Sequence, residues 1–204
     1  MPGNLIIVSA PSGAGKTSLV SAMLAATADI DLSVSYTTRP PRPGEVNGKD
    51  YHFVSRETFM EMTGRGDFLE SAEIYGNLYG TSQTWIQARM DAGRDILLEI
   101  DWQGSDQVRQ LVPECVSIFI LPPSIQTLED RLKGRGKDSA EVIARRMQSA
   151  RDEISHVAEF DYVIINDKLD DAVQQLRSVV IAERVRRDRQ LARHQELIEQ
   201  LNKR

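Results

Sequence analysis

The chain has 204 residues, of which 41% are hydrophobic, and its formal net charge at pH 7 is -5. This length suffices for one substantial core with a small inserted lobe, but not for two independent domains. The acidic balance argues against binding to nucleic acid or to an anionic membrane. Because Cys115 is the single cysteine and the apolar stretches are far shorter than a bilayer span, we expect a soluble, cytoplasmic protein without disulfides or membrane segments.

The first predicted elements are a buried strand and a helix. Residues 5–8 read Leu-Ile-Ile-Val, an apolar run between polar residues that is typical of a strand in a parallel sheet. After Gly15, the apolar residues Leu19, Val20 and Met23 recur at helical spacing. The chain is therefore expected to begin with strand, loop and helix in that order.

The loop between these elements has the sequence of a phosphate-binding loop. Gly15, Lys16 and Thr17 match the pattern of Gly, four residues, Gly, Lys and Ser or Thr, while Ala10 replaces the first Gly. Backbone N–H groups would turn toward the phosphates of a nucleotide triphosphate, Lys16 would hold the β and γ phosphates, and Thr17 would bind Mg²⁺. The alternative is a glycine-rich turn that merely joins strand to helix. The residues of the loop predicted to contact the nucleotide, which the resemblance described below identifies as ATP, are Ala10, Pro11, Ser12, Gly13, Ala14, Gly15, Lys16, Thr17 and Ser18.

Three further apolar runs predict strands at residues 96–100, 116–121 and 162–165, with helical patterns between them. This alternation predicts an α/β fold, with a P-loop NTPase core in which helices flank a mostly parallel sheet. From Leu169 onward the pattern is one long polar helix.

Asp101 follows the strand at residues 96–100 and is the candidate carboxylate on the magnesium side. The alternative is an Asp that caps the next helix, because Asp is a preferred cap residue. Residues 101–104 also fit the Asp-x-x-Gly pattern of GTPase switches. Such switches also need a late Asn-Lys-x-Asp to recognise guanine, and the nearest string, at residues 47–50, has the wrong order and falls too early.

Two irregular segments interrupt the core pattern. Residues 33–93 carry Arg-Pro-Pro-Arg and aromatic-polar alternation, which predicts an inserted lobe of mixed β/α structure. Residues 133–138 hold two glycines among basic residues, which is typical of a mobile lid. We therefore expect one domain over residues 1–204, divided into a core of residues 1–32 and 94–204, with a helical lid at about 124–150, and a lobe of residues 33–93.

A second anion site is predicted in the lobe. Arg39 and Arg42 flank a stiff Pro-Pro pair, which restricts the spacing of two guanidinium groups suited to a phosphate monoester. Tyr51 and Tyr79 add hydroxyl donors. Taken alone, the segment could equally be an exposed loop rich in Arg and Pro.

Several motifs, in this order and over almost the whole chain, resemble those of guanylate kinases. They are Ser35 to Arg42, Gly44 to Tyr51, Phe68 to Glu70, Gly76 to Thr81, Glu99 to Asp101 with Gln103-Gly104, and Arg131 to Arg135. The resemblance implies transfer of the γ-phosphoryl group of ATP to GMP, giving ADP and GDP. It implies Mg²⁺ as cofactor and ATP with GMP or dGMP as partners.

The resemblance also assigns roles to single residues. Glu70 would accept hydrogen bonds from the N1–H and the amine of guanine, Ser35 and Thr81 would donate to O6, and Asn166 would lie near the adenine of ATP. The implied GMP contacts are Ser35, Arg39, Arg42, Tyr51, Glu70, Tyr79, Thr81, Glu99 and Asp101.

Catalysis would depend on alignment and positive charge rather than on a general base. The GMP phosphate is already an anion at neutral pH, because the second pKa of a phosphate monoester is near 6. The implied catalytic residues are Lys16, Arg39, Arg131, Arg135 and Arg146. Arg135 lies between two glycines, so lid closure could bring it to the phosphates.

Two other functions share parts of this pattern. A non-catalytic guanylate-kinase-like interaction module would keep the fold but tends to lose the phosphate loop, and a kinase of phosphorylated ribose would have no need of Glu70. In the C-terminal segment, Leu191, His194, Ile198 and Leu201 fall near heptad spacing, which favours self-association, although a solvated helix face gives a similar pattern.

Overall fold

The computed structural model describes residues 2–134 and 139–203. Its main sheet has five parallel strands in the order β2-β7-β1-β8-β9. The strands are β1 Leu5–Ser9, β2 Ile30–Leu32, β7 Asp95–Glu99, β8 Val116–Leu121 and β9 Tyr162–Ile165. Four of them lie where the apolar runs predict strands, which confirms the expected parallel sheet.

Strand β2 was not predicted, because its three residues are too few to show a pattern. It pairs with β7 at the edge of the sheet, where Ile30 lies opposite Asp95. Arg94, beside β7, donates to Asp31 at 2.9 and 2.7 Å and to Asp29 at 3.0 Å. Contacts distant in sequence therefore define this strand.

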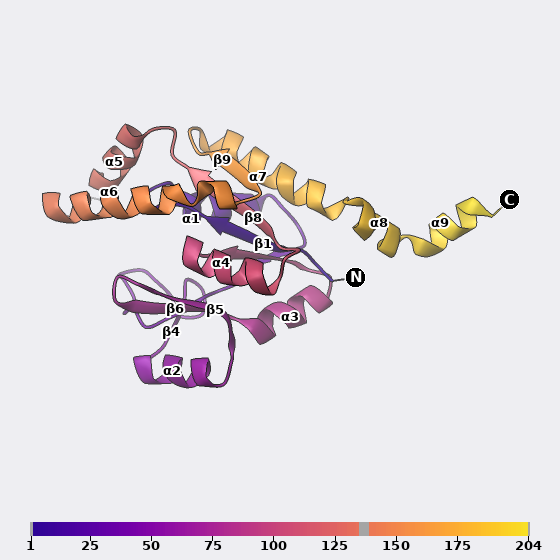
Figure 1. The fold of residues 1–204 in the computed structure, drawn as a ribbon, viewed down its shortest axis with the longest axis horizontal. Coiled ribbons are helices and arrows are strands. Elements are labelled where there is room, and N and C mark those ends of the chain that lie inside the picture. The colour runs from indigo at the N-terminus through magenta and orange to yellow at the C-terminus, as the bar shows by residue number, and fades with distance from the viewer. Residues whose placement is uncertain (1, 135–138, 204) are drawn as a thin grey trace.

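Helices cover both faces of the sheet (Figure 1). Helices α1 (Lys16–Ala25) and α7 (Leu169–Arg184) pack on one face through a fully buried cluster. Helices α3 (Gln83–Asp91) and α4 (Trp102–Leu111) pack on the other face. This three-layer arrangement leaves the carboxyl ends of β1 and β7 at one edge, where the phosphate loop leaves β1.

A second sheet lies beside the core, in the segment predicted as an inserted lobe. Its strands, in the order β4-β3-β6-β5, are β3 Tyr36–Thr37, β4 His52–Phe53, β5 Phe68–Ile74 and β6 Asn77–Ser82, and α2 (Arg56–Gly64) joins β4 to β5. Helix α3 follows directly but packs with core strands, because Ile86 is buried against the cluster that contains Ile7 and Leu98. The boundary at residue 93 stays a prediction.

A helical hairpin extends from the core. Ser124 caps helix α5 (Ile125–Lys133) and Ser139 caps α6 (Ala140–Ser155), each by accepting a backbone hydrogen bond. Their shared faces form a separate small cluster around Leu128 and Ala150. A short 3-10 turn, η1 (Val157–Glu159), leads from α6 to β9.

The prediction of one long helix from Leu169 is wrong. The segment forms three helices, α7, α8 (Arg187–Arg193) and α9 (Gln195–Asn202), and the last two extend away from the body (Figure 1). The chain turns at Arg186, whose ψ of 140° is not helical, and again at His194. The Gln190 side chain donates to the Arg184 carbonyl at 3.0 Å, which satisfies an end of α7. Within the described residues, no helix is both long and apolar enough to span a membrane.

Candidate active site

A cleft of about 290 Å³ lies between the phosphate loop and the second sheet. The core supplies most of the phosphate loop together with Glu99, Ile100 and Asp101, and α6 supplies Glu153. The second sheet and its loops supply the opposite wall, which includes Ser35, Arg42, Tyr51, Glu70 and Tyr79. The cleft therefore joins the two anion sites that the sequence predicts.

The phosphate loop has the open helix start that an anion site needs. Gly13 and Gly15 have φ values of 94° and 89°, which strongly favour glycine. Helix α1 begins at Lys16 without a side-chain cap, so its first N–H groups point toward the loop. The Lys16 ammonium donates to the Ile100 carbonyl at 3.1 Å, beside the cleft.

Two predicted ligand contacts instead support the loop from behind. The Asn166 amide, which is 5% exposed, donates to the Ala14 carbonyl at 2.8 Å. Arg131 donates to the same carbonyl at 3.2 Å and to the Asn166 carbonyl at 3.1 Å. A Cβ on Gly15 would lie 2.6 Å from the Asn166 amide nitrogen, so the loop fits tightly here. The buried Asn166 amide therefore holds the loop, and its expected position near the adenine of ATP stays a prediction.

Helix α6 also contacts the loop. Arg146 donates to the Ser12 hydroxyl at 2.8 Å, and the Glu153 carboxylate accepts from the Ser12 backbone N–H at 3.2 Å. Glu153 was not predicted, although a signal existed: it lies seven residues after Arg146 and thus on the same helix face. Arg135, the expected lid arginine, lies outside the described residues.

The carboxylate nearest to Thr17 is Glu99, not Asp101. The Thr17 hydroxyl donates to Glu99 at 2.5 Å. Asp101 caps α4 by accepting from the Gly104 backbone N–H at 2.9 Å, which is the alternative that the sequence left open. The described residues contain no cluster of three or more His, Cys, Asp or Glu side chains that could hold a metal alone. Hard oxygen groups from Thr17 and Glu99 nevertheless suit Mg²⁺ that also contacts phosphate oxygens.

Glu70 is the buried acidic group of the opposite wall. Its carboxylate is 4% exposed and accepts a short hydrogen bond from the Thr81 hydroxyl. Burial raises the pKa of Glu70 to about 7, opposed by the Thr81 hydrogen bond and aided by the negative charge of Asp101. Thr81 itself is fully buried. Its hydroxyl proton is directed at Glu70, and donation from Thr81 to O6 of guanine stays a prediction.

Gly104 makes room for Glu70. A Cβ on Gly104 would lie 2.5 Å from the Glu70 Oε2 and 3.1 Å from its Cδ. The sequence motif contained this glycine, but its spatial role depends on a contact between α4 and β5 that no local pattern reveals.

The arginine pair of the lobe is organised by Glu45. The Arg39 guanidinium donates to Glu45 at 2.8 Å, and the backbone N–H of Arg42 donates to the same carboxylate at 2.7 Å. The Glu45 carboxylate raises the pKa of Arg39, and the guanidinium lies 5.3 Å from the centre of the Tyr51 ring. Glu45 is a second residue that the sequence prediction missed. Arg42 is among the residues that line the cleft, whereas Arg39 is not.

Tyr51 is held as a neutral hydroxyl donor. Burial, together with the nearby charge of Glu99, raises its pKa to about 12. The Tyr51 ring meets the Tyr79 ring edge-on at 5.9 Å, and both tyrosines line the cleft. Two hydroxyl groups and the Arg42 guanidinium thus lie on one wall of the cleft, where the sequence predicts the second anion site.

Trp102 links α4 to the end of α6. Its ring stacks on His156, with 3.7 Å between ring centres and 9° between planes. His156 also contacts Glu159 at 2.7 Å. Trp85 is a packing residue, partly buried against the cluster that contains Ile7 and Leu98.

The parallel sheet, the phosphate loop and the facing anion site define a P-loop kinase of small phosphorylated acceptors. The family model "Guanylate kinase" matches residues 2–183. The chain is 56% identical to a guanylate kinase of Nitrosospira multiformis, over 99% of this chain and 96% of that protein. It is 55% identical to a guanylate kinase of Methylobacillus flagellatus, over 98% and 100%. A crystal structure of guanylate kinase from Anaplasma phagocytophilum aligns with a TM-score of 0.79 at 34% identity, covering 92% of this chain and 89% of that one. The chain belongs to the guanylate kinase family and is therefore a nucleotide-binding kinase.

Proposed function

We propose that this chain transfers the γ-phosphoryl group of ATP to GMP, or to dGMP, giving ADP and GDP in the cytoplasm. The observation that carries the proposal is the buried Glu70 carboxylate in the same cleft as the phosphate loop. A carboxylate can accept from both the N1–H and the amine of guanine, whereas adenine offers no such pair of donors.

The donor half of the site is assigned to the phosphate loop. Its N–H groups and the start of α1 would hold the β and γ phosphates, and Lys16 would turn from the Ile100 carbonyl to the same phosphates. Thr17 and Glu99 would hold Mg²⁺ together with phosphate oxygens, and the metal would neutralise charge on the transferring group. Asp101 and Asn166 would support these groups, through the start of α4 and the Ala14 carbonyl respectively.

The acceptor half is assigned to the second sheet. Arg42, Tyr51 and Tyr79 would hold the GMP phosphate, with Arg39 and Glu45 fixing the loop that carries Arg42. Ser35 would donate to O6 of guanine. Because the acceptor oxygen is already anionic at neutral pH, alignment of the two phosphates replaces a general base.

Arg146 supplies positive charge from α6 at Ser12 of the loop. Arg131 has its guanidinium on the carbonyls of Ala14 and Asn166, so it would act chiefly by shaping the loop. Arg135 is proposed as a further phosphate contact, on the sequence resemblance alone.

One assay separates this activity from the alternatives. Purified protein with ATP and Mg²⁺ is offered GMP, AMP, CMP, UMP or ribose bisphosphate, and ADP formation is followed. We expect turnover with GMP far above the others. Equal rates with AMP would remove the guanine assignment, a preference for ribose bisphosphate would indicate the other kinase, and no turnover with any acceptor would favour the interaction module.

Two variants assign the halves of the site. Lys16→Met should suppress turnover with every acceptor, because Lys16 faces the donor phosphates. Glu70→Ala should mainly weaken the preference for GMP over AMP, because guanine donors would be left unpaired. Full activity of Lys16→Met, or an unchanged preference in Glu70→Ala, would remove that residue from the site.

We also propose that the α8–α9 segment mediates self-association. Its exposed apolar side chains, Leu191, Leu197 and Leu201, are 48%, 51% and 75% exposed. Together with the near-heptad spacing of Leu191, Ile198 and Leu201, these side chains could pack against the same segment of a second copy.

A further inference from the structure

Glu153 is an acidic residue in a site built for anionic phosphates. It lines the cleft, and its Oε2 accepts from the Ser12 backbone N–H at 3.2 Å. That N–H belongs to the loop whose donors would hold ATP. A second carboxylate oxygen accepts from the Ser149 hydroxyl at 3.4 Å. None of the roles proposed above uses this carboxylate. Its negative charge occupies an N–H group that a bound phosphate would need.

The same carboxylate is connected to the acceptor lobe. Tyr75 lies in the turn between β5 and β6, and its hydroxyl donates to the Ser149 hydroxyl of α6 at 2.9 Å. Hydrogen bonds therefore run from Tyr75 through Ser149 and Glu153 to Ser12. Tyr75 has a φ of 50°, and its side chain is held across the cleft although the residue is 61% exposed.

The packing of α6 permits Glu153 to move. The apolar side chains of α6 form a small cluster with α5, separate from the two clusters on the sheet. Figure 1 shows α5 and α6 projecting beyond the sheet, and Glu153 of α6 lines the cleft. A shift of this hairpin would withdraw Glu153 without breaking the main core.

We propose that Glu153 is a positioning residue that occupies the phosphate loop as an internal anion, and that ATP binding displaces it. Two anions cannot share the Ser12 N–H, so each ATP molecule must overcome this contact. Displacement also separates Glu153 from Ser149 and Tyr75, so the acceptor lobe and α6 become free to rearrange as the donor binds. Burial raises the pKa of Glu153, while the positive charge of Lys16 opposes this shift, which agrees with a carboxylate held at a cost.

The decisive measurement is equilibrium binding of ATP and of ADP to Glu153→Gln, without GMP. Removing the negative charge should tighten binding of both nucleotides roughly five- to tenfold, on the scale of the net contribution of one ordinary hydrogen bond. The KM for ATP should fall while the KM for GMP stays within about twofold of the unchanged protein. Unchanged or weaker nucleotide binding would overturn the proposal.

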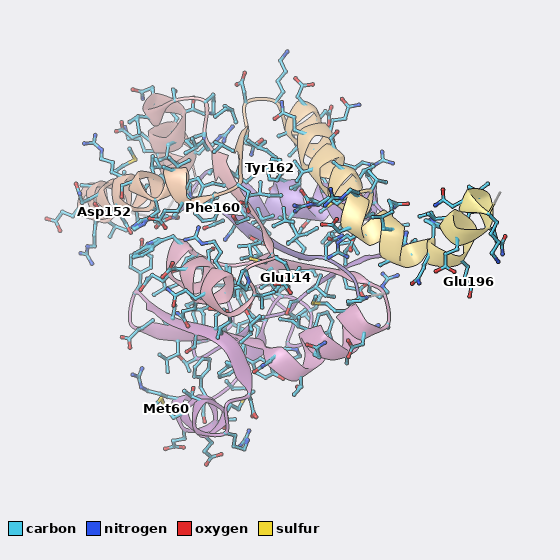
Figure 2. All side chains as sticks on the ribbon, turned by 45° about the vertical axis from the view of Figure 1, so that its right-hand side comes forward. Met60, Glu114, Asp152, Phe160, Tyr162 and Glu196 are labelled. Atoms are coloured by element: carbon cyan, nitrogen blue, oxygen red, sulfur yellow. The ribbon has the colours of Figure 1, made fainter. Side chains whose placement is uncertain are left out.

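Asp152 provides the matched control. It precedes Glu153 on α6, is exposed, and contacts Gln148 within the helix at 3.2 Å; its position is labelled in Figure 2. Asp152→Asn makes the same change of charge one residue away and should leave nucleotide binding unchanged. An equal gain in both variants would mean that net charge alone is responsible, which would also overturn the proposal.

The link to the lobe has its own test. Tyr75→Phe removes the hydroxyl that contacts Ser149 and should tighten ATP binding by a smaller factor than Glu153→Gln. No change in Tyr75→Phe would overturn the link. GMP binding, measured by calorimetry in each variant, reports that the variant is folded.

The inference rests on the proposed ATP site. If the unchanged protein fails to bind ATP, the proposed function is wrong. If it binds ATP with an affinity that the Glu153 variant does not change, only this inference is wrong.

Discussion

Among single residues, Glu70 has the property that most directly links structure to pH. Its pKa is raised to about 7 by burial, so the protonated form is well populated near neutral pH. Only the ionised carboxylate can accept from both guanine donors. The site should therefore improve as pH rises through 7 and weaken as pH falls below it.

We expect the KM for GMP to rise about tenfold between pH 8 and pH 6, because about a tenth of a group with a pKa of 7 is ionised at pH 6. Ionisation of the GMP phosphate, with a second pKa near 6, adds a smaller change. Glu70→Gln separates the two effects, since this variant should keep only the phosphate-dependent part. Identical pH profiles in both proteins would contradict the assignment.

Gly104 offers a test of how Glu70 is positioned. Gly104→Ala adds a methyl group at 2.5 Å from the Glu70 carboxylate, although alanine suits the helix better by about 1 kcal/mol. We expect a several-fold higher KM for GMP with little loss of thermal stability. Gly64→Ala, in α2, is the control, because a Cβ there meets no atom within 4 Å. Equal KM values for GMP in the two variants would show that the Glu70 side chain can move to accommodate the added methyl group, which would contradict this prediction.

The sequence predicts which residues belong to the site, but not which partner each side chain binds. The motif identified Glu70 and Asp101 as residues of the site, and both line the cleft. It could not show that Thr81 donates to Glu70, or that Asp101 caps a helix, because one hydroxyl proton or one carboxylate can serve several partners. Which partner each group binds depends on the distances between side chains in the folded structure.

At the scale of elements, the phosphate loop depends on supports far along the chain. The Asn166 amide and the Arg131 guanidinium both hold the Ala14 carbonyl, from the end of β9 and from α5. Removing one support leaves a buried carbonyl with fewer donors and a cavity beside Gly15.

Asn166→Ala should therefore destabilise the protein by about 1–3 kcal/mol, the usual cost of an unpaired buried polar group. It should also raise the KM for ATP more than the KM for GMP. Thermal unfolding and paired kinetics would check both. A change in GMP kinetics alone would argue that Asn166 does not act through the loop.

The regular elements were predictable where one pattern ran long enough. Strands β1, β8 and β9 and the helix after Gly15 follow local hydrophobic spacing, so their positions were anticipated. Strand β2 is too short for such a pattern, and the breaks in the C-terminal segment come from single backbone turns at Arg186 and His194. Helical composition continues through those turns, so spacing alone predicted one helix.

For the molecule as a whole, the α8–α9 segment lies apart from the catalytic machinery. Glu196, labelled in Figure 2, marks the outer helix, far from the sheet. The family model ends at residue 183, before this segment begins. Its contacts with the body include Arg189, which donates to the Pro2 carbonyl at 3.0 Å.

A chain that ends after Arg186 should keep its fold and its ATP:GMP turnover within about twofold, because no described cleft residue is removed. It should lose any self-association, which light scattering after size exclusion would detect. Equal molar mass for the full and shortened chains, each as one copy, would contradict the proposed role of the leucines.

The stack of Trp102 on His156 would make the protein an optical reporter of the α6 shift proposed above. Indole emission is quenched by a stacked imidazole, and this pair joins α4, beside the guanine site, to the far end of α6. With Trp85 replaced by Phe, Trp102 would be the sole indole, since the chain has 2 Trp. Addition of ATP should then brighten the emission if α6 shifts, and His156→Leu should abolish that response. The rate of the nucleotide-driven motion could thus be measured from the fluorescence of one native side chain, without an attached dye.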